Sequence, residues 1–361
     1  MVQLLLAPSH RRQVALLLCC FLLLPVAGLG KSSKTGPLPP APELLLEGGR
    51  KLSFVATFSS ERETRGKQGF WSKVLDVVAG EPEYHRVIRP YSVVVDSRGR
   101  IIVADPGAGG VHIFDFEQHK YKFLDRREKN KDPMRTPQCV AVDEQDNIYV
   151  SDSDAGKIFV FDTHGNFRRV IGSIRGGEGF FKRPTGIAVD SHAGRIYISD
   201  TLRDQIFVLD MDGAVLAKIG KHGTEAGELY YPTELRLTSQ GLMVVDAMNF
   251  RVQFFGLDGT AQGSIGHLGD NIGEMFRPKG VGVDSEGHIY VVDGLLGVVQ
   301  VFNREGELLY YFGSRGTGFG EFQLPAGLFI DKNDRIYVVD SFNARIQVFQ
   351  YYGVSKTGVK K

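Results

Sequence analysis

The chain has 361 residues, of which 42% are apolar and 24% charged, and its formal net charge is +1. This composition is typical of a globular protein, and the lack of excess positive charge argues against nucleic acid as a partner. The 44 glycines follow no collagen-like period and therefore indicate many tight turns.

Residues 1–30 are predicted to be a secretory signal peptide. Two arginines precede the apolar run 14–24, and small residues at 28–30 are suited to cleavage. The run is short for a membrane span, so we expect export to the periplasm or the extracellular space, with no membrane span in the mature chain. Retention as an uncleaved N-terminal anchor is the alternative. Cleavage leaves Cys139 as the only cysteine, so no internal disulfide is expected.

Three further segments lie outside the repeated part of the chain. Residues 31–49 contain four prolines and are predicted to be a linker between the signal peptide and the folded domain. Residues 353–361 form a short basic tail. The stretch from Trp71 to Arg89 is an insertion, much longer than the corresponding connections elsewhere, and it holds the only tryptophan.

Two landmarks recur six times. Prolines stand 46 to 48 residues apart, at Pro90, Pro137, Pro184, Pro232, Pro278 and Pro325. Aspartates follow them in step at Asp105, Asp152, Asp200, Asp246, Asp293 and Asp340. Each repeat contains four short runs of β-branched and aromatic residues separated by turn residues, and no segment has a sustained helical period. Six repeats of four strands predict an all-β fold, a six-bladed β-propeller of four-stranded antiparallel blades.

A propeller must also close its ring. The sixth repeat supplies only three strands, the last of them at 346–352. Near the other end, residues 51–58 resemble the fourth strand of the fifth repeat, at 307–312. We therefore predict that this N-terminal strand completes the last blade and that the propeller spans residues 50–352.

Two loops carry a recognisable motif. Asp246-Ala-Met-Asn249-Phe-Arg251 and Asp340-Ser-Phe-Asn343-Ala-Arg345 resemble the NHL repeat, a strand-turn-strand signature. The resemblance covers residues 50–352 and implies an exported bacterial six-bladed propeller. It implies little about activity, because such propellers carry many unrelated functions.

The proline and the aspartate of each repeat are expected at the same end of the blade, around the mouth of the central channel. The six aspartates are interpreted as structural, since an aspartate after a strand accepts backbone N–H bonds and shapes the next loop. Function is expected where side chains differ between repeats. The predicted ligand-binding residues on this face are Trp71, Tyr91, Gln138, Glu234, Arg236, Arg251, Lys279 and Arg345.

The fourth repeat differs most from the others. Glu234 and Arg236 place two charges on the same side of one innermost strand, and Thr238 stands where the other repeats have aspartate. Buried charges must be paired or solvated. The two residues therefore form either a structural ion pair or a ligand-facing site in the channel.

No catalytic residue, metal or cofactor is predicted. The histidines fall outside the innermost strands, and there is no nucleophile motif or phosphate-binding loop. The preferred interpretation is a monomeric, non-catalytic module that binds a protein or peptide in the cell envelope. The alternative is a metal-dependent lyase or lactonase-like hydrolase acting around Glu234 in the channel mouth.

Overall fold

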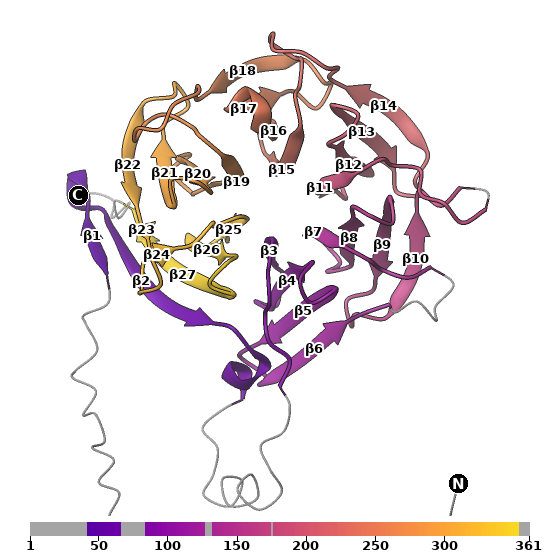
Figure 1. Cartoon of the computed structure of the whole chain (residues 1–361), viewed down its shortest axis with the longest axis horizontal. Helices are drawn as coiled ribbons and strands as arrows, with labels where there is room; N and C mark the ends of the chain where they lie inside the picture. Colours follow the sequence, from indigo (N-terminus) through magenta and orange to yellow (C-terminus); the bar gives the residue numbers. More distant parts are fainter. Residues whose placement is uncertain (1–41, 66–83, 127–131, 175, 354–361) are drawn as a thin grey trace, which may run out of the picture. The chain divides into compact units, whose positions relative to one another are not determined.

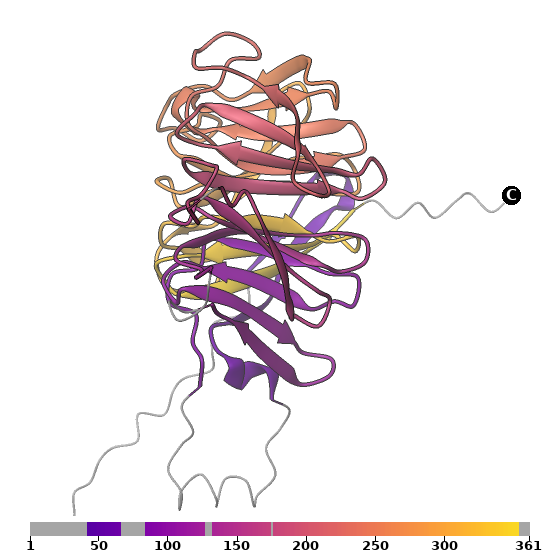
Figure 2. The same ribbon diagram turned by 90° about the vertical axis from the view of Figure 1, so that its right-hand side faces the viewer.

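The structure, a computed structural model, describes residues 42–65, 84–126, 132–174 and 176–353. Six antiparallel sheets are arranged radially around a central channel (Figure 1), which confirms the predicted all-β six-bladed propeller. Seen from the side, the strands run between the two faces of the ring (Figure 2). Apart from the strands, the only regular secondary structure in the described residues is three short 3-10 helices, namely η1 (Glu47–Gly49), η2 (Glu61–Thr64) and η3 (Ala247–Asn249).

Blades 1 to 5 each contain four consecutive strands, ordered from the channel outwards. Blade 1 consists of β3 (Ser92–Val95), β4 (Ile101–Asp105), β5 (Gly110–Asp115) and β6 (Lys120–Leu124). Blade 2 consists of β7 (Pro137–Val142), β8 (Ile148–Asp152), β9 (Lys157–Phe161) and β10 (Phe167–Ile171). Blade 3 consists of β11 (Pro184–Asp190), β12 (Arg195–Asp200), β13 (Gln205–Asp210) and β14 (Val215–Ile219).

Blade 4 consists of β15 (Pro232–Thr238), β16 (Gly241–Asp246), β17 (Arg251–Phe255) and β18 (Ala261–Ile265). Blade 5 consists of β19 (Pro278–Val283), β20 (Ile289–Asp293), β21 (Val298–Phe302) and β22 (Leu308–Phe312). Two very short parallel strands, β23 (Ser314–Arg315) and β24 (Glu321–Phe322), pair within the connection to blade 6.

Blade 6 is built from both ends of the propeller. Its inner strands are β25 (Leu328–Ile330), β26 (Arg335–Asp340) and β27 (Arg345–Tyr352), and its fourth strand is β2 (Lys51–Phe58). Strand β2 pairs antiparallel with β27, from Lys51 opposite Tyr352 to Phe58 opposite Ile346. The prediction that this segment closes the ring is confirmed.

A fifth strand lies outside β2 and was not expected. Strand β1 (Glu43–Leu45) pairs antiparallel with β2. It lies within the stretch 31–49 that the sequence assigns to a linker. The last blade therefore begins before residue 50. Of the other segments predicted from the sequence, the signal peptide, most of the tail and Trp71 lie outside the described residues.

The hydrophobic core is divided into six layers, one between each pair of neighbouring blades. Each layer receives a buried phenylalanine from the third strand of a blade: Phe114, Phe159, Phe207, Phe255, Phe302 and Phe349. Both faces of every sheet are covered by a neighbour, so the inner strands are nearly continuous apolar runs. Burial of one such side chain contributes about 1.5–3 kcal/mol.

The innermost strands approach one another closely around the channel. A Cβ atom on Gly186 would lie 2.2 Å from the carbonyl oxygen of Thr233, and one on Gly327 would lie 2.5 Å from that of Tyr91. Only glycine fits at these two positions without a shift of the neighbouring backbone. Larger residues at the same level, such as Glu234, must therefore be accommodated by the channel itself. No helix in the described part of the chain is long and apolar enough to cross a membrane.

Candidate functional site at the channel mouth

The prolines and aspartates of the repeats lie at one end of the channel. Pro137 is opposite Asp152 in the strand pairing, and Pro232 is opposite Asp246. We call this end of the ring, which carries the repeat prolines and aspartates, the proline face. The expectation that both landmarks share one face is confirmed.

The six aspartates belong to the scaffold. Asp293 is fully buried, and its carboxylate accepts the backbone N–H groups of Phe276, Arg277, Leu295 and Leu296 at 2.7–3.0 Å. These contacts tie the connection that enters a blade to the turn after its second strand. The structural interpretation of the aspartates is therefore correct.

Arg251 and Arg345 are part of the same scaffold. In Arg345, Nε donates to Asp340 at 2.7 Å, and the two terminal nitrogens donate to backbone carbonyls of the preceding connection, including Thr317 and Glu321. Arg251 repeats this pattern with Asp246. Their side chains are only 14% and 13% exposed. Most of their N–H groups are therefore used within the fold, and the ligand-binding role expected from the sequence stays a prediction.

The residues that follow each proline line the channel mouth. Tyr91, Gln138 and Lys279 are half-buried, and Thr233 is buried. The Lys279 ammonium lies 5.6 Å from the centre of the Tyr91 ring, although the two residues come from blades 5 and 1. The structure therefore brings Tyr91 and Lys279 together, as the sequence could not have shown.

Positive charge is concentrated at this mouth. Burial, together with the positive charges of Arg277 and Arg183, lowers the pKa of Lys279 to about 8, although Cys139 acts in the opposite direction. Burial also raises the pKa of the Tyr91 phenol well above its usual value. The buried hydroxyl of Thr233 has no hydrogen-bond partner among the described residues. The mouth thus offers crowded cations and an unsatisfied hydroxyl, which together favour an anionic group.

Sequence reasoning missed Arg183 and Arg277. Both immediately precede a repeat proline, as does Arg89. Arg183 donates from Nη1 to the Tyr231 hydroxyl at 2.9 Å, and both arginine side chains are exposed. A positional comparison of the residue before each proline would have found them.

Exposed apolar side chains surround these cations. Tyr230 and Phe276, two residues before a proline, are 39% and 41% exposed. Two residues after a repeat aspartate, Leu202, Met248 and Phe342 are also exposed. Exposed apolar groups gathered on one face are typical of surfaces that contact another molecule.

Glu234 and Arg236 form an ion pair inside the channel, which is one of the two arrangements that the sequence left open. The Arg236 Nη2 lies 3.4 Å from Glu234 Oε1, and the Cys139 thiol lies 3.4 Å from Glu234 Oε2. Burial raises the pKa of Glu234, and the charge of Arg236 opposes this effect. Burial, followed by the charge of Glu234, raises the pKa of Cys139, so its thiol is kept protonated.

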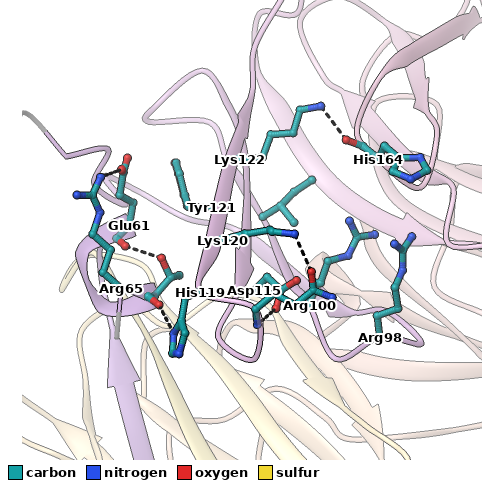
Figure 3. Close-up of a pocket in the computed structure, with 13 residues that line it drawn as sticks. Glu61, Arg65, Arg98, Arg100, Asp115, His119, Lys120, Tyr121, Lys122 and His164 are labelled. Atoms are coloured by element: carbon teal, nitrogen blue, oxygen red, sulfur yellow. Dashed lines mark hydrogen bonds and ion pairs between the residues drawn. The ribbon is translucent and has the colours of Figure 1, made fainter. Parts of the chain in front are cut away.

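A second concave region lies at the outside of blade 1, between η2 and the ends of β5 and β6 (Figure 3). This groove has a volume of about 680 Å³ and many basic side chains. Several of them are engaged: Arg98 pairs with Asp146, Arg100 pairs with Asp96, and Lys122 donates to the carbonyl of His164. We interpret the contacts of Arg98 and Lys122 as scaffold that joins blade 1 to blade 2, and that of Arg100 as scaffold within blade 1.

Metal-ligating side chains do not gather in the described ranges, where no group of three or more His, Cys, Asp or Glu could hold an ion.

The fold and the residues at the channel mouth together define a class of protein. It is a closed six-bladed propeller whose channel opens on a face with basic residues and exposed apolar side chains. A family model described as a 6-bladed beta-propeller matches residues 134–197, 188–267 and 282–361, which is more than half of the chain. The chain belongs to this family. No curated protein matches the sequence.

Solved structures of low sequence identity share the fold. A protein of unknown function from Bacteroides thetaiotaomicron has a TM-score of 0.57 at 15% identity, covering 86% of this chain and 84% of that one. A catalytically inactive virginiamycin B lyase from Staphylococcus aureus, solved with quinupristin, has a TM-score of 0.53 at 14% identity, with 75% and 86% covered. An auxiliary nutrient binding protein from Bacteroides thetaiotaomicron has a TM-score of 0.54 at 13% identity, with 73% and 69% covered. At these identities the likeness shows the fold alone.

Proposed function

We propose that this chain is an exported propeller of the NHL type that binds a peptide or protein segment on its proline face, without catalysing a reaction. The bound segment carries a carboxylate, which lies at the channel mouth between Arg183, Arg277 and Lys279. The sequence of residues 1–30 supports export, and the loop motifs of blades 4 and 6 support the NHL assignment.

The observation that carries the proposal is the crowding of three cations at one mouth. Burial is the main cause of the lowered pKa of Lys279, and the positive charges of Arg277 and Arg183 act in the same direction. A carboxylate placed there would relieve the repulsion and accept hydrogen bonds from the Lys279 ammonium and the Thr233 hydroxyl. Charge-assisted bonds of this kind are among the strongest in proteins.

A peptide fits this face better than a small anion does. The exposed Tyr230, Phe276 and Phe342 extend the surface beyond the charged centre. Aromatic side chains next to arginines are enriched at the energetically important positions of protein interfaces. A small anion would leave these side chains uncovered.

Selection from a phage library of random 12-residue peptides tests the proposal. We expect the selected sequences to be enriched in Asp or Glu together with aromatic or aliphatic residues. Synthetic fluorescein-labelled versions are then titrated by fluorescence polarisation against the wild type and the double variant Arg183→Glu/Arg277→Glu. The double variant should bind at least tenfold more weakly, because charged contacts at an interface are lost and replaced by repulsion.

The matched control is Arg195→Glu/Arg304→Glu, which changes the net charge equally on the opposite face. It should bind the selected peptides like the wild type. Selection without acidic enrichment, or equal weakening by both double variants, would contradict the proposal.

A further inference from the structure

A cavity occupies the end of the channel away from the proline face. Its volume is about 430 Å³, within the range of small-molecule sites. It is lined by the last residues of all six innermost strands, most of them aliphatic. We call it the distal cavity. It lies on the other side of the Glu234–Arg236 pair from the peptide site, so it does not depend on the proposed function.

The walls of the distal cavity are apolar although they face open space. The half-buried residues Val142, Val189, Leu237, Val283 and Ile330, one from each of five blades, contribute to the wall. A ring of partly exposed aliphatic side chains around an opening is unfavourable in water. An apolar occupant would remove that surface from water.

Arg236 is the only charged residue in this lining. Its Nε donates to the carbonyl of Val281 at 3.2 Å, its Nη2 donates to that of Leu328 at 2.8 Å, and its guanidinium lies 5.1 Å from the Phe329 ring centre. These contacts hold the guanidinium between blades 4, 5 and 6. Its Nη1 has no hydrogen-bond partner among the described residues, and the side chain is 20% exposed.

The lip of the cavity next to Arg236 lacks a carboxylate. In the other five blades an aspartate ends the innermost strand or directly follows it: Asp96, Asp143, Asp190, Asp284 and Asp331. In blade 4 this position is Thr238, which lines the cavity and bonds only within its own hairpin. Blade 4, which supplies Arg236, therefore has the neutral Thr238 at the opening of the cavity. An entering anion meets less electrostatic repulsion there than it would from an aspartate at the same position.

We propose that the distal cavity binds a small amphiphile, namely a carboxylate with an apolar body of medium length. The carboxylate accepts hydrogen bonds from Arg236, and the apolar body lies against the ring of aliphatic side chains. Glu234 competes with the ligand for the same guanidinium. The affinity for the ligand therefore depends on both members of the pair, in opposite directions.

Isothermal titration calorimetry with decanoate tests the proposal on the full-length protein. We expect one molecule of decanoate to bind per chain, and decanol, which has the same apolar body without the charge, to bind at least tenfold more weakly. Glu234→Gln should tighten decanoate binding several-fold, because Arg236 is then no longer neutralised. The double variant Glu234→Gln/Arg236→Met, which leaves no unpaired charge, should bind decanoate at least tenfold more weakly than the wild type, since a hydrogen bond to a charged group is lost.

A steric variant makes the test independent of charge. Ala141 lines the cavity at the position that Phe329 occupies in blade 6, so Ala141→Phe should fill the cavity and abolish binding. Arg304→Met, in an outer turn of blade 5, should bind like the wild type. Circular dichroism and thermal unfolding establish that each variant is folded. The proposal is overturned if decanoate does not bind the wild type, if decanol binds equally well, or if folded Ala141→Phe or the double variant binds decanoate unchanged.

Discussion

Replacement of Arg236 by methionine should destabilise the protein far more than replacement of Glu234 by glutamine. Glu234 is 5% exposed and would be left as a buried carboxylate without its cation. Breaking a buried ion pair by removing one partner costs about 3–5 kcal/mol. The same change also leaves the carbonyls of Val281 and Leu328 without their donor. We therefore expect a loss of about 3–5 kcal/mol for Arg236→Met at pH 8.

The loss should depend on pH in a defined direction. Burial already raises the folded-state pKa of Glu234 above its usual value of 4.5, and the charge of Arg236 limits the rise. Without Arg236 the folded-state pKa rises further. A group with a raised folded-state pKa binds protons more tightly when folded, so stability increases as the pH falls through that pKa. The destabilisation by Arg236→Met should thus be largest at pH 8 and shrink as the pH falls towards 4.5.

Urea unfolding at several pH values, followed by circular dichroism, measures this difference. Glu234→Gln should cost about 1–2 kcal/mol, because Arg236 keeps its two carbonyl acceptors and some contact with water. The double variant Glu234→Gln/Arg236→Met should recover most of the stability lost in Arg236→Met. The reasoning is refuted if Arg236→Met costs less than about 1 kcal/mol, or if the double variant is no more stable than the single one.

Three further predictions concern closure, scaffold and mouth. Phe58→Ala should lower stability by about 3–5 kcal/mol in thermal unfolding, because the aromatic ring of Phe58, on the closing strand β2, packs 5.0 Å from that of Phe114. Val55→Ala, at an exposed position of the same strand, is the control, and equal effects of the two variants would contradict the closure argument. Asp246→Ala should cost about 3 kcal/mol or more in urea unfolding, because it leaves the nearly buried Arg251 unpaired, and a loss below about 1 kcal/mol would refute the scaffold role. Lys279 should react with acetic anhydride with a pH midpoint near 8, which mass spectrometry can follow. A midpoint near the ordinary value of about 10.4 would contradict both the burial of Lys279 and the crowding of cations around it.

The fold could be predicted because the sequence of each repeat contains the apolar runs and turn residues that mark its own strands. The closing strand was found from a missing partner, since three strands in the last repeat required a fourth from elsewhere, and β2 has the predicted bounds Lys51–Phe58. Strand β1 was missed because it follows a proline-rich stretch and is only three residues long. Among the described strands it pairs only with β2, another N-terminal strand. The blade already has four strands without it, so counting the strands of each repeat gave no reason to expect a fifth.

The candidate site was harder to predict because its contacts join distant repeats. Glu234 and Arg236 were found as departures from the repeat, but their spacing on one strand left open whether they pair with each other or face a ligand. The contacts of Arg345 within the fold were not predicted, because the carbonyls that bind it belong to the connection 24 to 28 residues earlier. The proximity of Lys279 and Tyr91 depends on ring closure, which no local pattern encodes.

The joining of both chain ends in blade 6 has a consequence for the order of assembly. Thr57 Oγ1 donates to the carbonyl of Ile346 across 289 positions of the chain. During synthesis, β2 emerges first and its partner β27 emerges last, so the edge of β2 stays unpaired until nearly the whole protein has been made. Pairing at such long range is intrinsically slow, and an open strand edge invites association with other chains. The order of the strands in the sequence therefore leaves one strand edge open to association with other copies until synthesis of the propeller is nearly complete.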